Sequence, residues 1–247
     1  MKQLYSIYLF WMLGTLLARA ANILSPNTDS GNSSSIGPFL LPQSFSSMRY
    51  QQVFSASDFL PLQNSGGGYI TQIAFRMDSA SPLFAGYSFP DLQVNMSTTS
   101  KTPDGLSSVF SQNVGADNTI VFQRGSLAVP GMQSGTIGYF INFQTPFFYD
   151  AAPGHNLILD VRNYQAGYVS FAGLSFFDAE NTVGDSVSSV WSLSVNGTMA
   201  DAVDTIGLVT QFTYTPVPEP SAILLTICGL GVLGLVSIVK RGRWNLQ

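Results

Sequence analysis

The sequence predicts an all-β fold, and we expect an antiparallel β-sandwich of jelly-roll-like type. Apolar and polar residues alternate with a period of two along several segments, as they do in strands with one buried side. Gly, Pro, Asp and Asn separate these segments, and no amphipathic helix is evident between them. Strands joined in this way pair antiparallel and form two sheets packed face to face.

The chain begins with a predicted secretory signal peptide at residues 1–20. Lys2 precedes an apolar stretch at 4–17, and Ala18 and Ala20 are small residues at the two positions that a signal peptidase reads. A first transmembrane helix is the alternative, but the apolar stretch is short for a span. We therefore expect signal peptidase to remove this segment and the mature chain to be exported.

A flexible lead-in is expected at 21–47. Ser, Asn, Gly and Pro dominate residues 22–42, a composition typical of linkers. Folded structure is therefore expected from residue 48 onward.

The predicted β-sandwich domain spans 48–215, enough chain for one sizeable core. Alternation is clearest at 69–77, where Tyr69, Thr71 and Ile73 are expected on one side and Ile70 and Gln72 on the other. We predict nine strands, at 49–55, 69–77, 92–97, 119–124, 139–144, 156–162, 168–177, 187–195 and 208–214.

The exported part is acidic and lacks cysteine. Residues 22–216 contain thirteen acidic residues against five basic ones, which leaves a formal net charge of −8. Nucleic acids and anionic lipid head groups are therefore poor partners, because both require phosphate neutralisation. The single cysteine, Cys228, lies near the C-terminal end, so the exported domain depends on packing rather than disulfides.

A transmembrane helix is predicted at 222–239, an apolar run without charge. At about 1.5 Å per residue such a helix reaches about 27 Å, close to the hydrocarbon thickness of a bilayer. The basic tail 240–243 follows, with Lys240, Arg241 and Arg243. Because basic residues stay on the cytoplasmic side, everything before the helix is expected outside the cytoplasm.

An extended segment precedes that helix. Pro218 and Pro220 flank Glu219, and each proline removes a backbone donor and fixes a φ angle, so the segment cannot join the helix. Pro-Glu-Pro, a hydrophobic helix and a basic tail, together covering 216–243, resemble the PEP-CTERM sorting signal of exported bacterial proteins. A plain C-terminal anchor that retains a periplasmic protein in the inner membrane is the alternative.

The resemblance implies a processing partner and a destination. PEP-CTERM tails are read by an exosortase, a membrane-embedded enzyme of Gram-negative bacteria that make exopolysaccharide. We therefore expect an inner-membrane precursor that moves to the cell surface or the medium, in a setting such as a biofilm. Segments 48–54, 73–76, 94–100, 113–117 and 157–163 also look like segments of PEP-CTERM proteins of unassigned function, which supply no catalytic residue.

No catalytic residue is predicted. His155 is the single histidine and stands in a turn before a strand, without a Gly-x-Ser-x-Gly elbow elsewhere. One histidine and no cysteine in the expected exported part leave only carboxylates as further ligands, which argues against a zinc site. No pair of carboxylates stands out for glycoside hydrolysis. A secreted enzyme acting on polysaccharide is kept as the alternative.

Calcium is the one cofactor considered. Carboxylates and loop carbonyls suit this ion, but no Asp-x-Asp-x-Asp spacing supports a site, and the same acids serve as turn formers. The carboxylates concerned are Asp150, Asp160, Asp178, Glu180 and Asp185.

Sugar binding is the remaining functional class. Aromatic rings on a sheet face can stack against sugar rings, and the aromatics with a polar handle are Trp191, Tyr50, Tyr87, Tyr164 and Tyr168. Trp191 shares parity with Leu193 and Val195, which favours the core for that residue. The sequence therefore indicates a non-catalytic module of the envelope or matrix, either structural or associated with exopolysaccharide.

Overall fold

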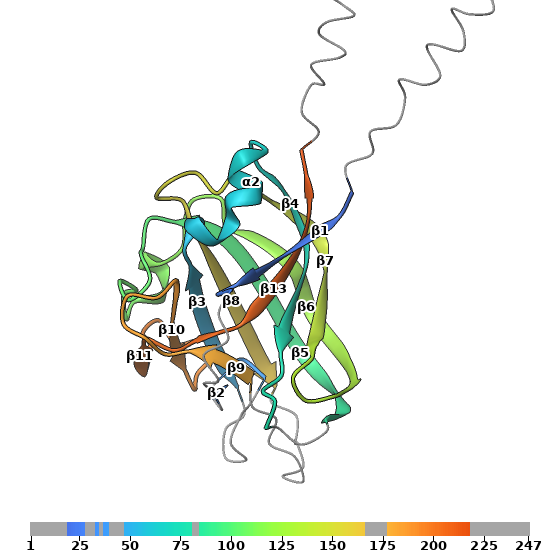
Figure 1. The fold of residues 1–247 in the computed structure, drawn as a ribbon. Helices are drawn as coiled ribbons and strands as arrows, with labels where there is room; N and C mark the ends of the chain where they lie inside the picture. Colours follow the sequence, from blue (N-terminus) through green and yellow to red (C-terminus); the bar gives the residue numbers. More distant parts are fainter. Residues whose placement is uncertain are drawn as a thin grey trace, which may run out of the picture. The chain divides into compact units, whose positions relative to one another are not determined.

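Antiparallel sheets make up most of the structure, a computed structural model that describes residues 19–27, 33–34, 37–39, 47–80, 84–165 and 177–217 (Figure 1). A four-stranded sheet has the order β1-β13-β4-β7, and a six-stranded sheet the order β11-β10-β3-β8-β5-β6. The strands of the first sheet are β1 (Ala21–Ser25), β4 (Gly68–Arg76), β7 (Ile137–Tyr149) and β13 (Thr210–Pro216). Those of the second are β3 (Met48–Phe54), β5 (Phe84–Thr99), β6 (Thr119–Met132), β8 (Asn156–Gln165), β10 (Val187–Ser192) and β11 (Ala202–Asp204).

Shorter elements complete the fold. A small third sheet has the order β12-β9-β2. The remaining elements are β2 (Ser33–Ser34), β9 (Phe177–Glu180), β12 (Gly207–Leu208), the helical turns η1 (Ala56–Phe59) and η2 (Phe110–Gln112), and the helix α2 (Leu60–Asn64).

The predicted all-β fold is confirmed. A strand overlaps each of the predicted segments. The segment 168–177 is overlapped only at Phe177, because residues 168–176 lie outside the described ranges. The predicted helix 222–239 also lies outside them. Within the described ranges, no helix has both the length and the apolar character needed to cross a membrane.

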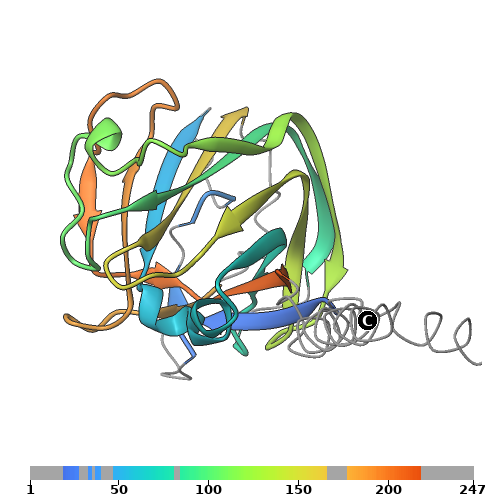
Figure 2. The ribbon, with the colours of Figure 1, turned by 90° about the horizontal axis from the view of Figure 1, so that it is seen from above.

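The two main sheets face each other (Figure 2). The space between them is filled by a core rich in aromatic side chains. Phe54 of β3 meets Phe212 of β13 edge to face, with ring centroids 4.9 Å apart. Phe39 joins a second cluster, 5.2 Å from Phe75 and 5.3 Å from Phe89. Such ring pairs add to the large stabilisation from burying aromatic area, which suits a domain without disulfides.

Two connections close the ends of the core. η1 and α2 follow β3 directly and bury Phe59 and Leu62, and Phe59 packs 5.2 Å from Tyr149. On one side, β6 and β7 follow each other in sequence and lie at the edges of different sheets. The amide N–H of Gln123 donates to Oε1 of Gln144 across this junction, at 2.8 Å.

The lead-in expected to be flexible contains ordered structure at its start and at Phe39. β1 pairs with β13 along its whole length, from Ala21 opposite Tyr214 to Ser25 opposite Thr210. Ile23 is buried, and Phe39 is 1% exposed in the core. The composition of the lead-in predicted neither feature. A five-residue edge strand with two inward side chains leaves only a weak periodic signal, and an isolated buried Phe leaves none.

We predict that Ile23→Ala destabilises the domain. Its side chain is buried in the main core, and replacing a buried Ile by Ala costs about 2–5 kcal/mol, with the lower end expected at an edge strand. Urea unfolding of the full chain in mild detergent, followed by circular dichroism, measures the change. Leu24→Ala, on the half-buried side of the same strand, is the control, and equal losses for both variants would contradict the burial argument.

Candidate functional site

The outer face of the six-stranded sheet carries most of the buried polar side chains. In β3 every residue is buried, so this strand is covered on both sides. Tyr50 and Phe54 belong to the main core, whereas Arg49 and Gln51 point the other way because side chains alternate along a strand. The outward residues of β5 and β8 continue this face, and they are Gln93, Asn95, Ser97, Thr99, Ile158, Asp160, Arg162 and Tyr164.

One half of this face is covered by the segment between β5 and β6. Phe110 and Leu106 pack on Val53, Ile158 and Val190 and form a second, smaller apolar cluster. The segment then runs close to β5, where a Cβ on Gly115 would lie 2.2 Å from the carbonyl oxygen of Thr98. Glycine at this position is what allows the segment to approach the sheet.

A buried ion pair lies beneath that cover. Arg49 donates to both carboxylate oxygens of Asp160, from Nε at 3.2 Å and from its terminal nitrogen at 2.6 Å. Gln51 donates to the same carboxylate at 2.9 Å and receives a hydrogen bond from Asn113 at 3.0 Å. The Arg49 guanidinium also lies 4.4 Å from the centre of the Phe110 ring. These contacts attach the covering segment to the sheet.

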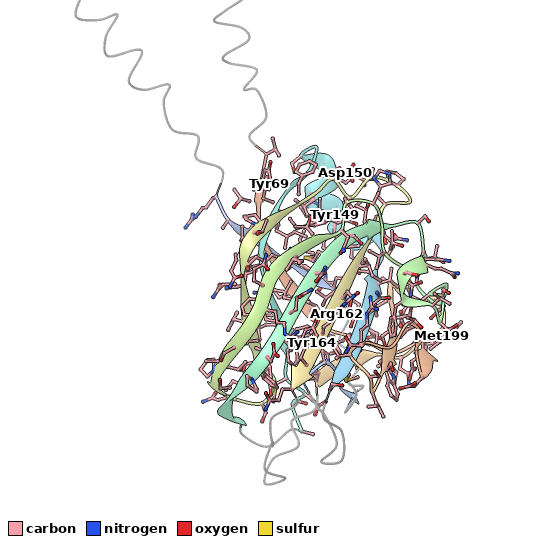
Figure 3. The ribbon with its side chains drawn as sticks, turned by 180° about the vertical axis from the view of Figure 1, so that it is seen from behind. Tyr69, Tyr149, Asp150, Arg162, Tyr164 and Met199 are labelled. Carbon is pink, nitrogen blue, oxygen red and sulfur yellow. The ribbon has the colours of Figure 1, made fainter. Side chains whose placement is uncertain are left out.

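The other half of the outer face is open, and we call it the Arg162 face: Asp91, Gln93, Arg124, Arg162 and Tyr164. Arg124 forms a bidentate pair with Asp91 at 2.8 and 2.7 Å, and its guanidinium lies 3.7 Å from the centre of the Tyr164 ring. The hydrogen bonds from Arg124 hold the pKa of Asp91 below its ordinary value. Figure 3 shows Arg162 and Tyr164 on the outward side of β8, with no described strand in front of them.

Arg162 differs from its neighbours in its partners. Its Nε lies 3.8 Å from an Asp160 oxygen, an ion-pair distance too long for a hydrogen bond. Among the described residues this Nε has no hydrogen-bond partner, although it is shielded from water. Arg49 stands directly opposite Arg162 on β3. The carboxylate of Asp160 is thus the nearest acid to two guanidinium groups. Together Arg49, Asp160 and Arg162 carry a formal charge of +1.

One of the aromatic residues that the sequence offered for sugar stacking lies on this face. Tyr164 is there, but Arg124 covers one side of its ring. Tyr50 is fully buried, and burial raises the pKa of its hydroxyl far above the ordinary value, so it is a core residue. Trp191 packs partly buried against the main core, as its parity predicted. The side chains of Tyr87 and Tyr168 lie outside the described part of the chain.

An exposed aromatic pair was missed. Tyr69 and Phe148 stand opposite each other on β4 and β7, with ring centroids 5.5 Å apart, and are 49% and 45% exposed. Strict alternation predicted Tyr69 on the side of Ile73, but a register shift between Ile70 and Gln72 changes the parity, and Ile70 is buried instead. A bulge of this kind leaves no reliable trace in the pattern.

Three of the carboxylates considered for calcium have separate surroundings. Asp160 pairs with Arg49, Asp178 pairs with Arg76, and Asp150 lies in the turn after β7. In the part of the chain that the structure describes, no group of three or more His, Cys, Asp and Glu residues is placed to hold a metal ion.

The carboxylate of Asp185 has a different environment. Burial raises its pKa, and the nearby carboxylates of Asp104 and Glu180 act in the same direction. The amide N–H groups of Val187 and Thr182 donate to it at 2.9 and 3.0 Å and oppose the rise. These bonds fix the turn before β10, which is the turn-forming role expected of such acids.

His155 occupies the predicted turn. Its backbone N–H bonds to the carbonyl of Ala152 at 2.8 Å, and its ring lies 3.1 Å from Asp150. Burial acts to raise the pKa of Asp150, but hydrogen bonds from the Ala152 N–H and the His155 ring outweigh it and the pKa is lowered. Among the described residues no serine bonds to the ring, so a Ser-His-Asp arrangement is not assembled there.

The predicted processing residues lie mostly outside the described ranges. This is true of Ala18, of the sorting segment Pro218, Glu219 and Pro220, and of Lys240, Arg241 and Arg243. Ala20 is described, is exposed and directly precedes β1. Comparison of the chain with protein-family models, with curated proteins and with solved structures gave no match.

We predict that Arg49→Gln destabilises the fold by about 3–5 kcal/mol, because it leaves the buried Asp160 carboxylate without its principal cation. Arg162→Gln removes the same charge one strand away but breaks no hydrogen bond among the described residues, so its effect should stay within about 0.5 kcal/mol. Urea unfolding of both full-length variants measures the difference. Equal losses would show that the Arg49 pair has no special role.

Proposed function

We propose that the chain is an exported cell-envelope or extracellular-matrix protein whose domain, a jelly-roll-like β-sandwich, binds glycans without catalysing a reaction on them. The Arg162 face carries this proposal. It offers guanidinium, amide and phenol groups on an open strand surface, the kinds of group that recognise sugar hydroxyls and acidic substituents. A secreted enzyme acting on polysaccharide is the alternative, and nucleic acid is not a proposed partner.

The limits of the folded domain support the proposed export and sorting. β1 begins at Ala21, immediately after the proposed signal-peptidase site at Ala20, so cleavage there leaves the first strand intact. β13 ends at Pro216, two residues before the segment that we propose an exosortase reads. Processing at either end therefore spares every described strand.

Incubation with the host's exopolysaccharide tests the proposed function. We predict that the full chain in mild detergent retains this polymer on an affinity resin and releases no shorter fragments, because no catalytic arrangement is proposed. Size-exclusion chromatography of the polymer before and after incubation provides the readout. Shortening of the polymer would show that the protein is an enzyme. A lack of retention would contradict glycan binding and favour a purely structural role.

The sorting proposal is tested by replacing Pro218, Glu219 and Pro220 with Ala. We predict that insertion and orientation persist while release is blocked, so precursor accumulates in the inner membrane, because an apolar helix of about eighteen residues does not leave lipid unaided. Fractionation with an antibody against the β domain measures this, in a host that encodes an exosortase.

Neutral replacements of Lys240, Arg241 and Arg243 provide the comparison. They weaken the stop and the inside orientation, so part of the chain should pass through the membrane uncut. If the triple-Ala variant reached the cell surface at the wild-type level, the sorting proposal would be wrong. The C-terminal segment would then be interpreted as a plain membrane anchor.

A further inference from the structure

We propose that the Arg162 face binds a carboxylated polysaccharide, with the Arg162 guanidinium holding the uronic-acid carboxylate. This inference rests on the proposed glycan function and specifies the class of sugar. Three observations support it: the positive charge of Arg162 that no close ion pair neutralises, the exposure of the Arg162 side chain, and the groups beside it.

Charge is the first step. In a segment with an excess of acids, Arg49, Arg76 and Arg124 each form a close, hydrogen-bonded ion pair, with Asp160, Asp178 and Asp91 respectively. Arg162 faces a carboxylate that already accepts hydrogen bonds from Arg49 and Gln51. Its positive charge therefore remains available to an anion from outside.

Exposure is the second step. The Arg162 side chain is 30% exposed, whereas that of Arg49 is 10% exposed beneath the covering segment. A half-buried guanidinium with an unpaired, shielded Nε lacks part of its solvation. Because it is planar and can present two parallel N–H groups, it suits a carboxylate better than a single point charge does.

The neighbours of Arg162 favour a sugar as the bearer of that carboxylate. Gln93 stands directly opposite on β5. Its side-chain amide N–H donates to Asn95 at 2.7 Å, which leaves the side-chain carbonyl oxygen of Gln93 as the acceptor beside Arg162. A uronic acid combines a carboxylate acceptor with hydroxyl donors and so matches a guanidinium beside an amide oxygen. An acidic peptide offers the carboxylate without those hydroxyls.

Retention of polygalacturonate tests the inference, with its fully methyl-esterified form as the uncharged match and polyglutamate as the non-sugar polyanion. A chelator in all buffers removes bridging calcium. We expect the full chain in mild detergent to retain polygalacturonate at least about tenfold better than either comparison polymer, and less so as salt is raised.

Three variants locate the contact. Arg162→Gln should reduce retention of polygalacturonate by about tenfold, and Arg162→Lys, which keeps the charge but loses the planar fork, should fall between it and wild type. Lys101→Gln removes the same charge beyond the far end of β5 and should behave as wild type. Thermal unfolding of each variant checks that the fold is kept, and if Arg162→Gln does not fold, Arg162→Lys carries the comparison.

The outcomes separate the two proposals. Equal retention of the esterified polymer, or wild-type retention by Arg162→Gln, would overturn the carboxylate inference and leave the glycan function standing. Retention of polyglutamate as strong as that of polygalacturonate would overturn the assignment to a sugar. No retention of these polymers or of the host's exopolysaccharide would overturn both proposals.

Discussion

The buried pair of Arg49 and Asp160 is the interaction on which the outer side of the domain depends. A charge placed inside a sheet costs several kcal/mol unless it is paired and hydrogen-bonded, and here Gln51, Asn113 and the Phe110 ring complete its surroundings. These same groups hold the segment between β5 and β6 over the sheet. The ion pair thus determines where the cover ends and where the Arg162 face begins.

The inner side depends on packing alone. Aromatic residues from both main sheets meet there, and the edge strands are β1 and β7 in the four-stranded sheet and β11 and β6 in the six-stranded sheet. Since the sequence has a single cysteine, Cys228, and it lies beyond β13, no disulfide within the sheets compensates for a poorly packed strand. Even the short strand β1 contributes a buried side chain, Ile23, and Phe39 of the lead-in is buried in the same core.

Sequence periodicity was enough to predict the fold class, most strands and the core position of Trp191. It could not predict the second buried face of β3, because the cover is a distant segment with no periodic pattern of its own. It assigned Tyr69 to the wrong side, since the register shift at Ile70 depends on pairing with β7. The sequence also could not predict the role of Asp160 in the buried ion pair, because its partner Arg49 lies 111 residues away in the chain.

The proposed processing sites and the proposed glycan-binding face lie on different sheets of the domain. Ala21 pairs with Tyr214, so the two ends at which we propose processing lie side by side on adjacent strands of the four-stranded sheet. The Arg162 face lies on the outer side of the six-stranded sheet, with the aromatic core in between. Two packed sheets are about 10 Å apart, and side chains project beyond them on both outer faces. A cut made beyond β13 therefore removes no group from the Arg162 face, and the proposed sorting and the proposed glycan binding act through separate sets of residues.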